Sequence, residues 1–137
     1  MVISSCSTSK VVISHGIDMS KYSYVVFGEE STGDRVLEDV VMRVKNEIAM
    51  TKLIVVSEQE GLAKVALGKF VLYPNIYIST IKKEEVLTTS ITITFYDFYT
   101  NQSVAVLKSS GFGLIESQSQ STAISSIRKK LNSVYGY

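Results

Sequence analysis

The chain has 137 residues, of which 14 are lysine or arginine and 13 are aspartate or glutamate. This length predicts one domain, and the balanced charge argues against a nucleic-acid partner, because nucleic acid is held mostly by clustered lysine and arginine. A single cysteine excludes an intrachain disulfide and a zinc site of several cysteines. No apolar run approaches the roughly 20 residues that cross a bilayer, so membrane attachment would have to come from a lipid.

The single cysteine, Cys6, follows one aliphatic residue and two serines, and this stretch resembles the end of a bacterial lipobox. Small residues let the backbone lie extended in the processing enzymes, and the cysteine thiol takes the lipid. We therefore expect lipid attachment at Cys6, a signal remnant and polar spacer over residues 1–9, and one folded domain over residues 10–137. A secretory signal needs an apolar core of about 7–15 residues, which the sequence before the motif lacks. Two interpretations stay open: Met1 is not the true start, or Cys6 is incidental.

The first half of the domain predicts a β-α-β unit. Residues 24–27 and 53–56 are short apolar runs, and the segment between them, over residues 34–50, repeats apolar residues with helical spacing. The repeating positions are Val36, Val40, Val44 and Ile48, joined by Leu37 and Val41. We expect two parallel strands buried on both faces around one amphipathic helix. Residues 10–14 can add an edge strand.

The second half predicts a meander of strands followed by a helix. Residues 64–79 favour strand, but Pro74 indicates either a sheet edge or a break between two strands. Residues 87–98 alternate between apolar and polar side chains, and residues 104–107 follow a turn in which Asn101 tolerates the left-handed conformation of a tight hairpin. Residues 119–134 form the second amphipathic helix, with its buried stripe at Ala123, Ile127 and Leu131.

These elements predict an α+β fold. We expect a single mixed, mostly antiparallel β-sheet with two helices packed on one face, in the order β-α-β, β-meander and C-terminal helix. The two helices should meet the sheet through Val40, Val44, Ile48, Ile127 and Leu131.

The hairpin turn resembles a pattern common in small Gram-negative envelope lipoproteins. Residues 97–104 read Asp-Phe-Tyr-Thr-Asn-Gln-Ser-Val, close to Asp-x-x-Thr-Gly followed by a strand, and a Gly-Phe-Gly segment at 111–113 precedes the terminal helix. The chain is similar in this to the lipopolysaccharide-assembly lipoprotein and to the N-terminal domain of the Tol–Pal translocation protein. Asn101 stands where the pattern has glycine, and both accept a positive φ. The resemblance implies the fold and an envelope location, with Asp97 and Thr100 as turn formers and no active site.

Side chains for catalysis or metal binding are sparse. His15 is the only histidine and has no cysteine, aspartate or glutamate at ligand spacing, so it reads as a surface residue. The carboxylates at 58–60 and 84–85 read as solvated loops, the glycines at 111–113 as a bulge or strand end, and the basic run 128–130 as cations in the last turns of a helix. We therefore expect no catalytic residue, no metal and no cofactor.

Four tyrosines, Tyr73, Tyr77, Tyr96 and Tyr99, fall on or beside neighbouring strands, where several of them can share one sheet face. Tyrosine is enriched at interfaces, although it also simply favours strands. We expect a non-enzymatic, lipid-anchored domain of the periplasm or outer membrane that binds an envelope protein or a glycan. The alternative is a cytoplasmic small binding or regulatory domain in which Cys6 is incidental.

Overall fold

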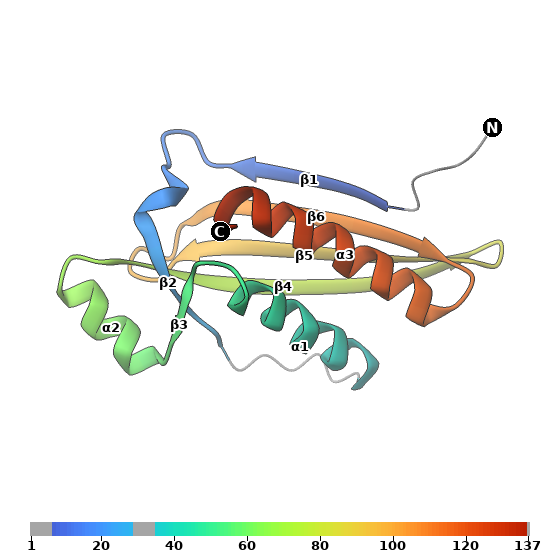
Figure 1. Cartoon of the computed structure of the whole chain (residues 1–137), viewed down its shortest axis with the longest axis horizontal. Helices are drawn as coiled ribbons and strands as arrows, with labels where there is room; N and C mark the ends of the chain where they lie inside the picture. Colours follow the sequence, from blue (N-terminus) through green and yellow to red (C-terminus); the bar gives the residue numbers. More distant parts are fainter. Residues whose placement is uncertain (1–6, 29–34, 137) are drawn as a thin grey trace.

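The computed structural model describes residues 7–28 and 35–136, which form one mixed sheet with three helices (Figure 1). The strands are β1 (Ser7–Ile13), β2 (Tyr22–Val26), β3 (Ile54–Val56), β4 (Phe70–Lys83), β5 (Val86–Asp97) and β6 (Ser103–Gly113), in the spatial order β1-β6-β5-β4-β2-β3. The helices are α1 (Arg35–Ala49), α2 (Glu58–Ala66) and α3 (Glu116–Tyr135), with a short 3-10 turn, η1 (Met19–Lys21). Strand β2 runs parallel to β3 and β4, and the other pairs are antiparallel. The predicted α+β fold and the parallel β2-α1-β3 unit are confirmed.

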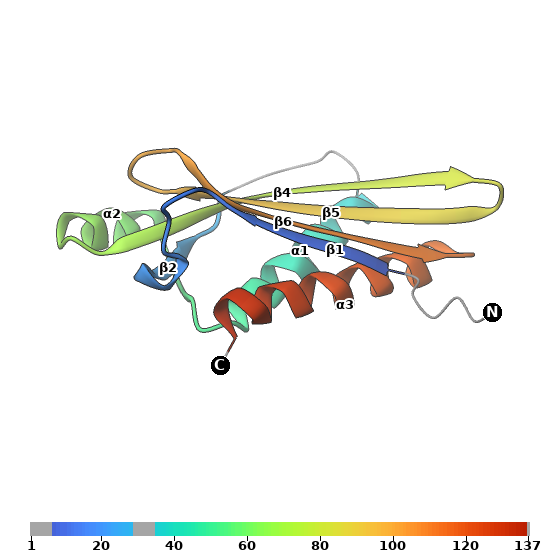
Figure 2. The ribbon, with the colours of Figure 1, turned by 90° about the horizontal axis from the view of Figure 1, so that it is seen from above.

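Helices α1 and α3 lie on the same face of the sheet, as predicted (Figure 2). The five side chains expected between them and the sheet are all buried in the main core: Val40, Val44, Ile48, Ile127 and Leu131. The guanidinium of Arg128 also bonds both carboxylate oxygens of Glu47 at 2.8 Å, which joins the two helices at the surface. The basic run 128–130 lies in the last two turns of α3, as expected, but the final turn has no basic residue, so the expected interaction with the helix dipole is weak there.

The first half of α3 lies unusually close to β5 and β6 because small residues face it there. A Cβ placed on Gly111 would come within 2.3 Å of the backbone nitrogen of Ala123 and 2.4 Å of the carbonyl oxygen of Ser119. The hydroxyl of Ser109 donates to the Ala123 carbonyl at 2.9 Å, and the Thr89 and Ser119 hydroxyls lie 2.8 Å apart. Gly111 therefore lets the helix backbone contact the strand directly, at the strand end expected for residues 111–113.

Helix α2 was not predicted, and it corrects two expectations. Residues 58–60 are its first turn rather than a loop, and residues 64–66 are helical rather than strand. Ser57 caps the helix by accepting a hydrogen bond from the Glu60 backbone N–H at 3.2 Å, while its hydroxyl donates to the Glu60 carboxylate at 3.1 Å. The helix packs over a small second core around Val26 and Val71.

Strand β3 differs from the prediction in burial, and strand β4 differs in its continuity. Residues Ile54 and Val55 of β3 are exposed, because β3 is the outermost strand and pairs with β2 alone. Strand β4 is continuous through Pro74, so the predicted break is wrong. The edge interpretation is confirmed, since the β2–β4 pairing ends at Leu72 and Pro74 follows beyond it.

The edge strand expected at 10–14 is confirmed and begins earlier, at Ser7. Ser7, Thr8 and Ser9 pair with Gly111, Ser110 and Ser109 of β6, so the spacer predicted over residues 7–9 is wrong there. Backbone hydrogen bonds of the sheet therefore hold these residues in place. Cys6 and residues 1–5 lie outside the residues that the structure describes. None of the described helices is both long and apolar enough to cross a bilayer.

Candidate interaction surface on the open sheet face

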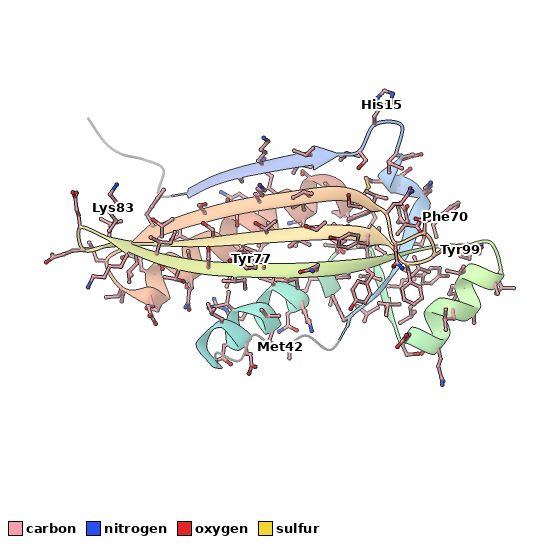
Figure 3. The ribbon with its side chains drawn as sticks, turned by 180° about the vertical axis from the view of Figure 1, so that it is seen from behind. His15, Met42, Phe70, Tyr77, Lys83 and Tyr99 are labelled. Atoms are coloured by element: carbon pink, nitrogen blue, oxygen red, sulfur yellow. The ribbon has the colours of Figure 1, made fainter. Side chains whose placement is uncertain are left out.

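The sheet face opposite α1 and α3 is left open over β4, β5, β6 and β1, while α2 covers the end of the sheet near β2 (Figure 3). Side chains alternate between the two faces along each strand. On β5, for example, Ile91, Ile93 and Phe95 are fully buried toward the helices, whereas Thr92 and Thr94 between them are partly exposed on the open face. The register of the sheet then decides which open-face side chains become neighbours.

One row of four side chains crosses the open face at right angles to the strands. Tyr77 of β4 pairs with Thr92 of β5, Thr92 with Lys108 of β6, and Lys108 with Lys10 of β1. Adjacent strands lie about 4.8 Å apart, so the row is about 14 Å long. Tyr77, which is 66% exposed, stands at one end of the row, about halfway along β4 in Figure 3, and the two exposed lysines stand at the other end.

The two lysines of this row are an unfavourable pair. Lys10 and Lys108 are directly opposite each other on antiparallel strands, where like charges destabilise a sheet. They line a shallow depression of about 240 Å³ together with Ser110. The four strands contain one acidic residue, Asp97, and it is buried at the end of β5. The charge of this face is therefore positive among the described strands.

Hydroxyl groups flank the row on one side. Ser79, Ser90 and Ser110 form the next row of the same face, and the hydroxyl oxygens of Ser90 and Ser110 lie 3.2 Å apart. The nearest carboxylates along β4 are Glu84 and Glu85, in the tight turn at the tip of the β4–β5 hairpin. They are exposed, as expected for residues 84–85, and Glu84 lies seven residues or about 23 Å from Tyr77 along the strand.

The four predicted tyrosines do not form one patch. Tyr73 and Tyr96 pair across β4 and β5 on the open face, but Tyr73 stacks on Phe98 with ring centroids 6.4 Å apart and belongs to the second core. Tyr99 lies in the β5–β6 turn, exposed at the end of the sheet. Tyr77 is thus the member of the set that is freely exposed on the sheet face.

The β5–β6 turn is built around Asp97, and this confirms its predicted role as a turn former. One carboxylate oxygen accepts hydrogen bonds from the backbone N–H groups of Tyr99 at 2.8 Å and Thr100 at 2.9 Å, and the other accepts from the Tyr22 hydroxyl at 2.7 Å. Asn101 has a φ of 59°, as predicted. Burial alone would raise the pKa of Asp97, but these hydrogen bonds stabilise the carboxylate and lower the pKa below its ordinary value. Burial and the bond to Asp97 raise the pKa of Tyr22.

A mostly apolar cavity of about 370 Å³ lies beside this turn, between the end of α2 and the start of β4. Its walls include Val65, Phe70, Val71 and Tyr99, with Asp97 at its edge. Both Asp97 oxygens are already occupied by the turn and by Tyr22, so the carboxylate is a structural group here.

The remaining residues considered for catalysis or metal binding lie apart from this surface. His15 is exposed in the turn after β1, as predicted. Asp18, the carboxylate nearest to it in sequence, caps η1 by accepting hydrogen bonds from the Ser20 backbone and hydroxyl at 3.0 and 2.6 Å. Across residues 7–28 and 35–136, no group of three or more metal-ligating side chains comes together.

Lys10, Thr92 and Lys108 were not singled out from the sequence. The alternation of residues 87–98 places Thr92 on the polar side, but nothing local indicates that Lys108 and Lys10 lie beside it. That neighbourhood depends on the pairing of β1 with β6, which are about a hundred residues apart in the chain.

No protein-family model matches the sequence, and no curated protein matches it either. Solved structures with the same fold were found. A PelC dodecamer from Paraburkholderia phytofirmans is similar with a TM-score of 0.57 and 11% identity, over 96% of this chain and 99% of that one. A PDZ domain protein from Parabacteroides distasonis is similar with a TM-score of 0.59 and 11% identity, over 94% of this chain and 36% of that one. At this identity the likeness shows a shared fold.

Proposed function

We propose that the chain is a non-enzymatic binding domain of the bacterial cell envelope, anchored by a lipid on Cys6, whose open sheet face binds another envelope component. The observation that carries this proposal is the face itself: four strands expose the row Tyr77, Thr92, Lys108 and Lys10 with no helix over it. Such side chains bind a partner by contact area, hydrogen bonds and charge. The lipobox-like stretch before β1 supports the envelope location.

The anchor is tested in the native host, with the gene in its own chromosomal context. Radioactive palmitate should label the protein and the labelled protein should partition into detergent, and Cys6→Ala should abolish both. Ser4→Ala is the control, because it keeps a small residue before the cysteine. An unlabelled protein found in the cytoplasmic fraction would instead support the cytoplasmic alternative.

The binding surface is tested by oxidative footprinting of intact cells against the purified protein. Tyr77 should be oxidised less in cells, because a bound component covers it. Met42, which is 58% exposed on α1 and away from the open face, should be oxidised equally in both samples (Figure 3). Equal oxidation of Tyr77 in cells and in solution would contradict the proposal.

A further inference from the structure

The open sheet face combines three features in one place. It presents an exposed aromatic ring at Tyr77, rows of hydroxyl groups, and the like-charged pair Lys10 and Lys108 in direct opposition. Folding alone gains nothing from two lysines placed opposite each other. Departures of this kind from locally favourable pairing are expected at functional sites.

We propose that this face binds an acidic polysaccharide, one that carries a carboxylate on its repeating sugars. The proposal rests on the proposed function and names the chemical class of the ligand. The ring of Tyr77 offers a flat apolar surface with a polar tip, which suits stacking against a sugar ring. The hydroxyls of Thr92, Ser90 and Ser110 can donate to and accept from sugar hydroxyls. Lys10 and Lys108 then hold a carboxylate between them, and this relieves their mutual repulsion.

The geometry fits an extended chain lying along the row. Tyr77 and Lys108 are two strand spacings apart, about 10 Å, and Lys10 is one spacing further. A polymer that crosses the strands therefore meets the ring first and the two charges afterwards. The one carboxylate of the four strands, Asp97, is buried and bonded, so no acid on these strands competes for the lysines.

The hydroxyl groups and the charge together separate this ligand from other occupants of the face. An acidic polysaccharide uses the hydroxyl groups as well as the lysines. An anionic membrane surface would instead leave the hydroxyls of Ser90 and Ser110 facing lipid headgroups. A second copy of the chain would bring lysines toward lysines if the same faces met. These occupants are outcomes of the test below.

The test measures binding of the purified protein to polygalacturonate and to its methyl ester, which removes the charge and keeps the sugar chain. We expect binding to polygalacturonate that weakens as salt rises, and a dissociation constant at least about tenfold higher for the ester. The double variant Lys10→Gln with Lys108→Gln should lose about tenfold or more in affinity and most of the salt dependence. Tyr77→Ala should also weaken binding but keep the salt dependence, because it removes contact area and no charge.

Matched controls are available on other surfaces. Lys52→Gln with Lys129→Gln removes two exposed lysines that lie off the open face, and Tyr99→Ala removes an exposed tyrosine outside the row. Both should bind within about twofold of the parent protein. The control variants and Tyr77→Ala should leave thermal unfolding unchanged, and the double lysine variant of the row should unfold at the same or a higher temperature, because it removes the like-charge pair. The proposal would be overturned by equal binding of the acid and its ester, or by equal losses of affinity in the control variants. It would also be overturned if the protein bound anionic lipid vesicles in place of the polysaccharide, or if substitutions in the row affected self-association and not polysaccharide binding.

The two proposals fail separately. If Tyr77 is protected in cells but polygalacturonate does not bind, the binding function stands and the acidic polysaccharide is refuted. If polygalacturonate binds through the row but palmitate labelling and footprinting are negative, the ligand class stands and the envelope function is refuted.

Discussion

Gly111→Ala tests the close contact between α3 and the sheet. The added Cβ would lie 2.3 Å from the Ala123 nitrogen and 2.4 Å from the Ser119 oxygen, where ordinary contact begins at 3.4 Å. Both are backbone atoms, so side-chain rotation cannot relieve the clash and α3 has to retreat by about 1 Å. Overpacking of this kind costs about 1–3 kcal/mol, and the weakened hydrogen bonds from Ser109 and between Thr89 and Ser119 cost about 0.5–1.5 kcal/mol each. We expect the free energy of unfolding to fall by about 2–6 kcal/mol.

The assay is urea denaturation followed by circular dichroism, with the slope of the transition checked for a constant m-value. Gly68→Ala is the matched control, since Gly68 has a φ of +79° and nothing within 4 Å of an added Cβ. That variant should lose only about 1 kcal/mol, from the left-handed backbone. The difference between the two variants isolates the helix contact. If Gly111→Ala is no more destabilising than Gly68→Ala, the direct backbone packing of α3 on β6 is wrong.

Four further expectations follow from the fold. Ile127→Ala removes a fully buried side chain of α3 and should lower the free energy of unfolding by about 2–5 kcal/mol in the same assay, and an unmoved midpoint would refute its place in the core. Asn101→Gly should be neutral or slightly stabilising, whereas Asn101→Val should cost about 1–3 kcal/mol at a φ of 59°. Tyr135→Phe should leave stability unchanged or raise it by about 1 kcal/mol. The buried hydroxyl of Tyr135 has no hydrogen-bond partner among the described residues, and the ring, which packs edge-on against Phe95, is kept in the variant. A clear loss of stability would show that the hydroxyl has a partner. The pKa of Asp97 is lower in the folded chain than its ordinary 3.8, so its contribution to stability is present above that value and is lost as the pH falls through the folded pKa. The Asp97→Asn variant should therefore be less stable than the parent at pH 7 and should lose less stability than the parent below about pH 4. Parallel pH profiles of the two proteins would contradict this.

Periodicity predicts best those elements that bury one face formed by residues close together in the sequence. The stripe through Val40, Val44 and Ile48 identifies α1 within the chain itself, since residues four apart share a helix face. Helix α2 has a short and weak apolar stripe, with Leu62 exposed, so its periodicity does not predict a helix. The signal that was present is the capping pair of Ser57 and Glu60.

The candidate surface, in contrast, could not be predicted from local sequence patterns. Each strand predicts by alternation which of its own side chains share a face, and this gave Thr92 and Tyr96 on one side of β5. Which of those side chains meet across the sheet depends on register, and a slip of one residue exchanges the faces. The pairing of Lys10 with Lys108 therefore depends on the tertiary structure and cannot be predicted from composition or local sequence pattern.

The early start of β1 also has a consequence for orientation. Ser7 is already paired with Gly111, so a lipid on Cys6 would be one residue, about 3.4 Å, from the sheet. So short a link would hold the domain with one end against the bilayer rather than let it swing freely. That end is the one at which β1 begins and the β4–β5 hairpin turns, while α2 lies at the far end (Figure 2). The exposed Leu114 and Ile115 follow the end of β6, three and four residues after the Gly111 that pairs with Ser7, so they would lie near the headgroups. The open face would then stand roughly perpendicular to the bilayer and stay accessible to a partner.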